Sequence, residues 1–168
     1  TPGGRATAER GLRLYRLGEL AWPGPAPDGA PRVAADSDAS LLTRWFTAFA
    51  DEVHDAEAGE DQAAAVRDKL SHGGVLLWEA GGRPVAVAGV SRQVAETLRV
   101  GPVYTPPELR GRGYASAVTA EASRRAREAG AEEVLLYTDL ANPTSNSIYQ
   151  RIGYRAVEDR VVLAFSVR

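Results

Sequence analysis

Arg110-Gly111-Arg112-Gly113-Tyr114-Ala115 is the stretch of this 168-residue sequence that decides the fold. It follows an apolar run, Leu98–Tyr104, and it opens a long helical pattern, Tyr114–Ala129. Glycines let a backbone approach a ligand closely and tolerate positive φ. The first turn of a helix presents free N–H groups at the positive end of its dipole. A strand, a glycine-rich loop and a helix start in that order predict a site for a phosphate or pyrophosphate.

Two familiar phosphate loops do not fit this stretch. A P-loop needs a Lys and then a Ser or Thr directly after its last glycine, and Gly113 is followed by neither. A dinucleotide-binding turn needs a third glycine, where this chain has Ser116. The stretch does fit the pattern Q/R-x-x-G-x-G/A, through Arg110, Gly113 and Ala115. Such a short pattern also occurs in loops that only cap a helix.

A second motif makes the first one specific. Directly after a strand-like run, Val134–Thr138, the segment Asn142–Tyr154 has the pattern N-x-x-S-x-x-I-Y-x-x-x-G-Y. In this order and at this separation, the two motifs make the sequence from about Arg32 to Arg168 resemble the GNAT superfamily of acetyl-CoA-dependent N-acetyltransferases. The resemblance implies that the first motif is the acetyl-CoA pyrophosphate loop and the second is the helix beside the thioester.

Composition excludes several other classes. The formal net charge of −2 gives no bulk attraction to nucleic acid or to an anionic membrane. The chain has no cysteine and only two histidines, so we expect no disulfide, no thiolate nucleophile and no metal. No apolar run approaches 18 residues. We therefore expect a soluble, cytoplasmic protein, for which a homodimer remains open.

The order of patterns predicts one α/β fold, a mixed central sheet with helices on both faces. The resemblance implies in addition that splayed strands of this sheet form the acetyl-CoA cleft. We divide the chain into an N-terminal strand and Pro-rich linker, 1–31, and an acetyltransferase domain, 32–168. The linker carries four prolines between Ala21 and Pro31, which predict extended chain without a strand ladder. The expected strands are Leu12–Leu17, Arg32–Ala35, Val75–Glu79, Pro84–Val90, Thr97–Thr105, Glu133–Thr138 and Val161–Val167, and the expected helices are Ala39–Val53, Asp61–Leu70, Tyr114–Ala129 and Ser145–Ile152.

The resemblance assigns roles to residues of both motifs. Backbone N–H groups of the loop would hold the pyrophosphate, and the strand before it would offer its bulged edge to the pantetheine arm. Asn142 would bind the pantetheine, although it equally fits a helix N-cap before Pro143, and Asn146 would contact the cosubstrate one turn later. The expected cofactor-binding residues are Val103, Tyr104, Thr105, Arg110, Gly111, Arg112, Gly113, Tyr114, Ala115, Asn142 and Asn146.

The chemistry needs a proton donor and a base. Tyr149 matches the family's tyrosine seven residues after the Asn, so the resemblance makes it the general acid; the alternative is a tyrosine of the core. Glu96, at the start of a cleft strand, is the first choice for the base. Asp139 is the second choice, and the remaining candidates are Glu52, His54, Asp55 and a water relay to a distant carboxylate.

The expected activity is transfer of an acetyl group to a primary amine by direct attack in a ternary complex, without a covalent enzyme intermediate. The alternative is a catalytically silent GNAT-like module that binds acetyl-CoA or a partner. The chain contains no methionine. Leu12–Leu17, followed by a Pro-rich linker, could close the sheet of a preceding domain, so we expect Thr1 not to be the natural start. Simple removal of an initiator Met is the alternative.

Overall fold

The computed structural model describes residues 5–53 and 61–166. Its seven strands form one sheet in the order β2-β3-β4-β5-β6-β1-β7. The strands are β1 (Arg5–Leu17), β2 (Ala30–Val33), β3 (Val75–Ala80), β4 (Arg83–Val90), β5 (Thr97–Tyr104), β6 (Glu133–Asp139) and β7 (Tyr154–Ser166). The helices are α1 (Ala39–Glu52), α2 (Gln62–Ser71), α3 (Tyr114–Glu128) and α4 (Pro143–Ile152), with short 3-10 turns η1 (Asp36–Asp38) and η2 (Pro107–Leu109).

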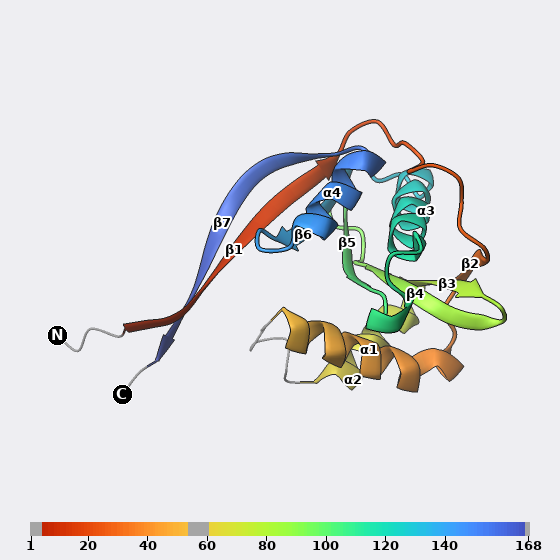
Figure 1. The fold of residues 1–168 in the computed structure, drawn as a ribbon, viewed down its shortest axis with the longest axis horizontal. Helices are drawn as coiled ribbons and strands as arrows, with labels where there is room; N and C mark the ends of the chain where they lie inside the picture. Colours follow the sequence, from red (N-terminus) through yellow and green to blue (C-terminus); the bar gives the residue numbers. More distant parts are fainter. Residues whose placement is uncertain (1–4, 54–60, 167–168) are drawn as a thin grey trace.

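The sheet is mixed and has helices on both faces, as the sequence predicts. β5 and β6 run parallel, and the other neighbouring strands pair antiparallel. In Figure 1, α1 and α2 lie at the bottom of the molecule, whereas α3 and α4 lie in its upper part, α4 beneath the ends of β1 and β7. Buried apolar side chains form one core on the α3 and α4 face, which includes Tyr15, Val100 and Leu136. A smaller core around Leu42 and Phe46 joins α1 and α2 to the sheet.

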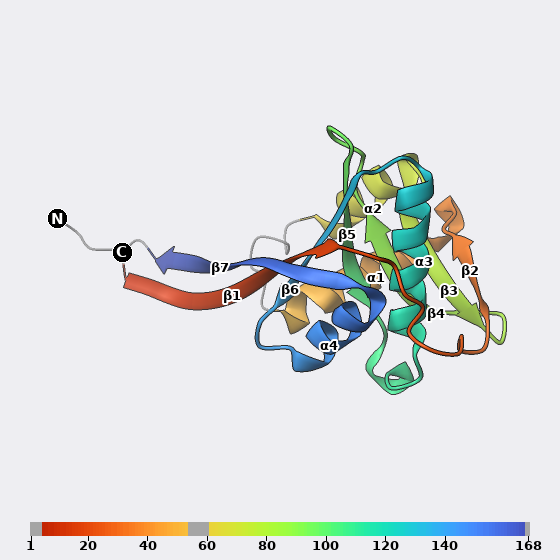
Figure 2. The ribbon, with the colours of Figure 1, turned by 90° about the horizontal axis from the view of Figure 1, so that it is seen from above.

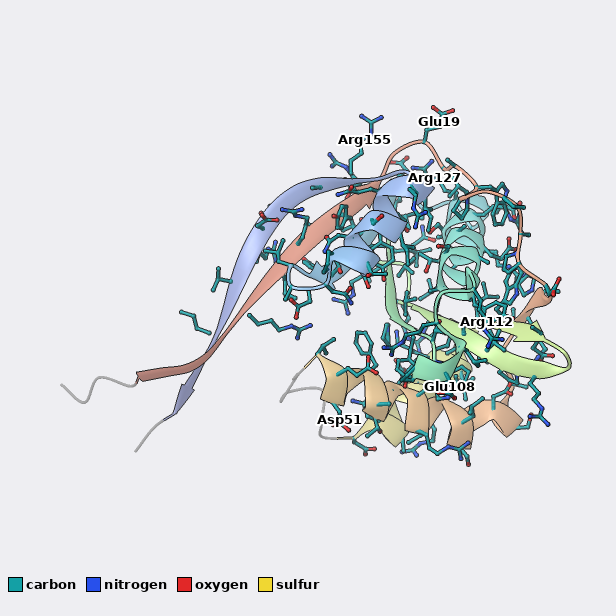
Figure 3. All side chains as sticks on the ribbon, in the orientation of Figure 1. Glu19, Asp51, Glu108, Arg112, Arg127 and Arg155 are labelled. Atoms are coloured by element: carbon teal, nitrogen blue, oxygen red, sulfur yellow. The ribbon has the colours of Figure 1, made fainter. Side chains whose placement is uncertain are left out.

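β1 occupies a position that the sequence patterns do not predict. It lies inside the sheet between β6 and β7, so the division at residue 31 does not separate two sheets. Arg127 of α3 fixes the end of this strand, because its Nη2 donates to the carbonyls of Leu17 and Gly18 at 2.9 and 2.8 Å. Arg127 is labelled beside this turn in Figure 3. These hydrogen bonds attach the end of β1 to α3, the helix that follows the glycine-rich loop.

β1 and β7 continue beyond the sheet as a two-stranded ribbon. β6 pairs with β1 only from Leu12 to Arg16, whereas β7 pairs with β1 from Arg5 to Leu17. Figures 1 and 2 show this ribbon reaching away from the helices. The last strand is also longer than expected, since it begins directly at Tyr154.

One part of the linker prediction is wrong. Ala30 and Pro31 pair with Glu79 and Trp78, so the proline run ends in a strand. This is possible because β2 is the edge strand of the sheet, where a proline without an N–H can face solvent. Across the described ranges, 5–53 and 61–166, no helix has both the length and the apolar character needed to cross a bilayer.

Candidate functional site

The cleft begins where two parallel strands separate. Within the described residues, β5 and β6 pair from Thr97 with Glu133 to Val100 with Leu136, and the pairing stops there although both strands continue. On its other side β5 stays paired with β4 up to Tyr104, with a register shift opposite Gly89. The predicted bulge and splay are therefore present. The β6-facing edge of residues 101–104 is left without a strand partner, and such an edge can pair with an extended ligand.

The unpaired edge leads into the glycine-rich loop. Gly111 and Gly113 have φ of 80° and 86°, which side chains with a Cβ rarely adopt. Gly113 is the N-cap of α3, and no side chain caps the helix start. The first turn of α3 carries no acidic residue, while Arg125 and Arg127 lie in its last turn. The free N–H groups and the dipole of α3 both favour an anion at this end.

The two loop arginines are placed differently from each other. Nη2 of Arg110 donates to both carboxylate oxygens of Glu52 at 2.7 and 2.8 Å, and its Nε donates to the carbonyl of Thr105 at 2.9 Å. Its guanidinium also lies 5.7 Å from the ring centroid of Tyr104. Arg110 thus ties the loop to α1. Arg112, labelled in Figure 3, is exposed and does not line the cleft.

The cleft has a volume of about 1280 Å³. That exceeds the roughly 300–1,000 Å³ typical of a site for one drug-sized ligand, so it suits a long cosubstrate together with an acceptor. Most of the predicted site residues line it, namely Val103, Tyr104, Thr105, Arg110, Gly111, Gly113, Tyr114, Ala115, Asn142 and Tyr149. Glu96, Arg112 and Asn146 do not.

Thr105 gives an independent sign that this wall receives a polar ligand. The residue is 7% exposed, and its Oγ1 has no hydrogen-bond partner within the described part of the chain. A buried hydroxyl without a partner is unfavourable by about 1–3 kcal/mol. Because Thr105 lies on the cleft wall between the open β5 edge and the loop, a bound pantetheine or phosphate group could supply the missing partner. The residues present therefore fit acetyl-CoA.

Tyr149 lies at the cleft but is mostly buried. Its ring packs edge-on against Tyr15 and Tyr154, with 6.3 Å between centroids in each case. Burial raises the pKa of Tyr149 to about 12, against a weaker opposing effect of its hydrogen bond with Ser145. The hydroxyl consequently keeps its proton at neutral pH. The side chain packs in the core, as one of the two predicted alternatives has it, and it also lines the cleft, where the other alternative, a general acid, would have to lie.

The two asparagines of the second motif also have structural roles. The side-chain oxygen of Asn142 accepts from the N–H of Ser145 at 3.1 Å, which makes it the N-cap of α4. Asn146 is fully engaged: its Nδ2 donates to the carbonyls of Asp139 and Asn142, and its Oδ1 accepts from the hydroxyl of Tyr15 at 2.6 Å. Asn142 lines the cleft and can contact a ligand, whereas Asn146 holds α4 against β6 and β1.

The structure does not bring Glu96 to the cleft. It is exposed at φ 65° in the turn before β5, and its carbonyl accepts from the N–H groups of Glu132 and Glu133. The splay begins only after Val100, so Glu96 lies at the far end of the paired segment.

Two of the other candidate bases do line the cleft, and both are ion-paired. Glu52 pairs with Arg110, and Oδ2 of Asp139 lies 3.3 Å from Nε of Arg10. His54 and Asp55 lie outside the described residues.

The cleft also contains residues that the sequence motifs did not indicate. The linker lines it from Trp22 to Pro27, and the Cβ of Pro27 lies 4.0 Å from the position of a Cβ built on Gly113. A second group is cationic and consists of Arg10, Lys69, Arg99 and Arg160. Strand alternation places Arg99 on one face of β5, but no sequence signal shows that β1 brings Arg10 and Leu12 to the cleft.

The fold and the cleft define the class of protein as an acetyltransferase of the GNAT type. The model of the acetyltransferase (GNAT) family matches residues 39–154, and the chain belongs to this family. A comparison with curated protein sequences gives no match. Across the described residues, no group of three or more His, Asp or Glu side chains could hold a metal ion.

Solved structures show the same fold at low sequence identity. A GNAT-family acetyltransferase from Novosphingobium aromaticivorans is 23% identical with a TM-score of 0.68, over 96% of this chain and 66% of that one. One from Colwellia psychrerythraea is 15% identical with a TM-score of 0.72, over 95% and 57%. An aminoglycoside N-acetyltransferase in complex with CoA is 17% identical with a TM-score of 0.63, over 80% and 92%. The chain thus spans less than two thirds of the first two proteins.

Proposed function

We propose that this protein is an acetyl-CoA-dependent N-acetyltransferase that acts on a primary amine in a ternary complex. The observation that carries the proposal is the continuity of the site. The open edge of β5, the unpartnered hydroxyl of Thr105 and the uncapped start of α3 follow one another along one cleft. The backbone edge suits the pantetheine amides of acetyl-CoA, and the helix N-terminus suits its pyrophosphate, with the hydroxyl between them.

The N–H groups of Tyr114 and Ala115 bind the pyrophosphate, and the N–H and C=O groups of Val103 pair with the pantetheine amides. An N–H group at the β5 bulge polarises the acetyl carbonyl. The cosubstrate supplies the acetyl thioester: the amine nitrogen bonds to the carbonyl carbon, the carbon–sulfur bond breaks, and the thiolate takes up a proton.

Tyr149 is the group placed to assist that last step. With its pKa near 12 it keeps its proton at pH 7, whereas a thiol has an unperturbed pKa of about 8.5. Full transfer of the phenolic proton to the thiolate is therefore uphill, and a hydrogen bond from Tyr149 stabilises the charge developing on sulfur. Solvent or the released ammonium proton completes the neutralisation.

The amine must lose a proton before it attacks, because an unperturbed lysine-like amine has a pKa of about 10.4. Of the two cleft carboxylates, Glu52 lies on the pyrophosphate side through its pair with Arg110. Asp139 ends β6 beyond the splay, opposite Leu12 of β1. We assign the base role to Asp139, in place of Glu96, acting directly or through one water.

One observation favours the silent binding module instead: both cleft carboxylates are already paired with arginines. The two functions are separated by measuring thiol release from acetyl-CoA with a panel of primary amines, alongside CoA binding by calorimetry. CoA binding with amine-dependent thiol release supports the enzyme. CoA binding without turnover on any amine identifies a binding module. If Gly113→Ala and Thr105→Val both keep the wild-type CoA affinity, the cosubstrate binds elsewhere.

A further inference from the structure

The end of the cleft away from the glycine-rich loop carries a concentration of positive charge. Arg99 of β5 and Arg160 of β7 both face the ring of Tyr137, with their guanidinium carbons 6.0 and 5.7 Å from the ring centroid. Lys69 of α2 lines the same wall. These residues come from four elements that lie far apart in the sequence, and the chain as a whole has a net charge of −2.

Strand registers place these groups on one face of the sheet. Leu98 and Val100 pack into the core beneath α3, so Arg99 between them projects to the opposite face, the one that α1 and α2 cover. Tyr137 pairs with Leu14, and Leu12 pairs with both Asp139 and Arg160. The aromatic ring, the carboxylate and the two guanidinium groups therefore face the same side.

Two of the cations have no carboxylate partner. Within residues 5–53 and 61–166, no Asp or Glu oxygen is paired with Arg99 or with Lys69. Arg160 is already paired with Glu158. Burial lowers the pKa of Lys69, and the nearby charge of Arg99 lowers it further, against a weaker opposing effect of the Asp68 carboxylate. Positive charges that destabilise one another at a cleft wall are stabilised by an anion bound between them.

The phosphates of the cosubstrate do not account for these charges. Arg99 and Tyr104 are five residues apart in a strand, which corresponds to about 16 Å at roughly 3.3 Å per residue. The glycine-rich loop lies further on, beyond η2. Arg99 thus lies in the paired segment just before the splay, away from the loop, and its guanidinium carbon is 6.0 Å from the ring of Tyr137, two residues before Asp139 on β6.

We propose that the acceptor carries an anionic group, a carboxylate or a phosphate, close to its primary amine, and that Arg99 and Lys69 bind this group. This inference rests on the proposed acetyltransferase function and names its substrate class. Arg99 supplies a planar fork that suits a carboxylate or a phosphate oxygen pair, and Lys69 adds a second positive charge. The anion would hold the amine beside Asp139, on the side of β5 opposite Tyr149.

Paired acceptors test the proposal. Thiol release from acetyl-CoA is measured with phenylalanine against phenylethylamine and with phosphoethanolamine against ethanolamine, because each pair differs only in the anionic group. We expect kcat/KM at least tenfold higher for the anionic member of one pair, and the pair that responds distinguishes carboxylate from phosphate. A preference for neutral amines or for a polyamine such as spermidine overturns the acceptor class but leaves the acetyltransferase standing. Absence of turnover on any amine overturns both.

Substitutions then test the assigned residues. Arg99→Gln and Lys69→Gln should each reduce the preference for the anionic acceptor at least tenfold through a higher KM, and Arg99→Lys should retain part of it. Arg83→Gln, at the first residue of β4, removes an exposed arginine that does not line the cleft, and it should leave the acceptor preference unchanged. An unchanged preference in folded Arg99→Gln and Lys69→Gln, checked by circular dichroism, would contradict the assignment.

Discussion

Glu52 and Arg110 form a bidentate ion pair across the mouth of the cleft, with Nη2 of Arg110 at 2.7 and 2.8 Å from the two carboxylate oxygens. The pair joins the last residue of α1 to the first residue of the glycine-rich loop, directly after η2. It therefore neutralises an arginine beside the predicted pyrophosphate site. Arg110 positions the loop, and the carboxylate of Glu52 already neutralises the charge of Arg110 before any anion binds.

We expect Glu52→Gln to tighten CoA binding. The amide can still accept from Arg110, but a negative charge near a polyanionic ligand is removed. At about 10 Å in water such a charge contributes about 0.4 kcal/mol per ligand charge, which predicts a two- to fivefold lower Kd by calorimetry at low salt. The difference should fade at high ionic strength. Asp51→Asn, on the same helix but outside the cleft lining, is the control. A large loss of kcat in Glu52→Gln would instead make Glu52 the base.

Thr105→Val should act oppositely on stability and on binding. Valine removes the buried hydroxyl that has no partner, so the free energy of unfolding should rise by about 1 kcal/mol. CoA affinity should fall by about three- to tenfold if the hydroxyl meets the cosubstrate. Thr119→Val is the matched control, because its Oγ1 is likewise buried and unpartnered among the described residues but lies outside the cleft. Equal behaviour of the two variants in CoA titrations would remove Thr105 from the site.

Tyr149→Phe should lower kcat by about 10²- to 10⁴-fold while leaving CoA affinity within twofold. Because burial raises the pKa of Tyr149 to about 12, the wild-type rate should show no descending limb from this group below about pH 11. Tyr15→Phe serves as the control, since Tyr15 is buried beside Tyr149 but does not line the cleft. A wild-type kcat in Tyr149→Phe would leave this side chain with its packing role alone.

Gly153→Ala should unfold the α4–β7 junction or destabilise it by about 3 kcal/mol or more. The residue has φ 114°, and a Cβ there would lie 2.0 Å from the carbonyl oxygen of Glu19. Gly130, which follows α3 with φ 95°, has no atom within 4 Å of a built Cβ. Gly130→Ala therefore carries the backbone strain without the overlap. The difference in the free energy of unfolding between the two variants, measured in urea, gives the effect of the close contact with Glu19. Equal losses of stability in both variants would show that backbone strain alone matters.

Glu121→Gln should destabilise the protein at neutral pH and much less in acid. Hydrogen bonds from Arg124, and more weakly from Arg125, lower the pKa of the Glu121 carboxyl against the opposing effect of burial. A lowered folded-state pKa gives stability that is present above the unfolded value of about 4.3 and is lost as the pH falls through the folded value. We expect a difference of about 1–2 kcal/mol at pH 7 in urea unfolding, shrinking below pH 4. Glu128→Gln, at an exposed carboxylate that also pairs with Arg124, should change stability by less than about 0.5 kcal/mol. If Glu121→Gln loses the same stability at every pH, the loss comes from side-chain packing and not from the charge of the carboxylate.

The local geometry of several cleft-lining residues could be predicted from the sequence. Gly113 must adopt positive φ to start α3, and Asn142 with Pro143 starts α4 through a side-chain cap. The bulge in β5 follows from Gly101-Pro102 within an apolar strand. Each of these depends on the φ and ψ preferences of a few consecutive residues, which a sequence states directly.

Glu96 shows why the base could not be predicted in the same way. A sequence places it at the start of a cleft strand, but the parallel pairing of β5 with β6 lasts until Val100 and keeps that end closed. Asn146 does not line the cleft as predicted, for a related reason. Its side-chain oxygen accepts a hydrogen bond from the hydroxyl of Tyr15, which lies more than a hundred residues earlier.

By itself, then, the sequence determined the glycine-rich loop, the two motif helices and the family, since glycine conformation, helix capping and residue spacing act over short distances. Only the tertiary structure decided that β1 lies between β6 and β7. That insertion brings Arg10 to Asp139 and lets β7 carry Arg160 over Tyr137. Strand order depends on which hydrogen-bonding edges meet once the whole chain is packed, and the period of a strand does not contain that information. The positive charge that Arg160 adds to the cleft is therefore a property of the assembled sheet.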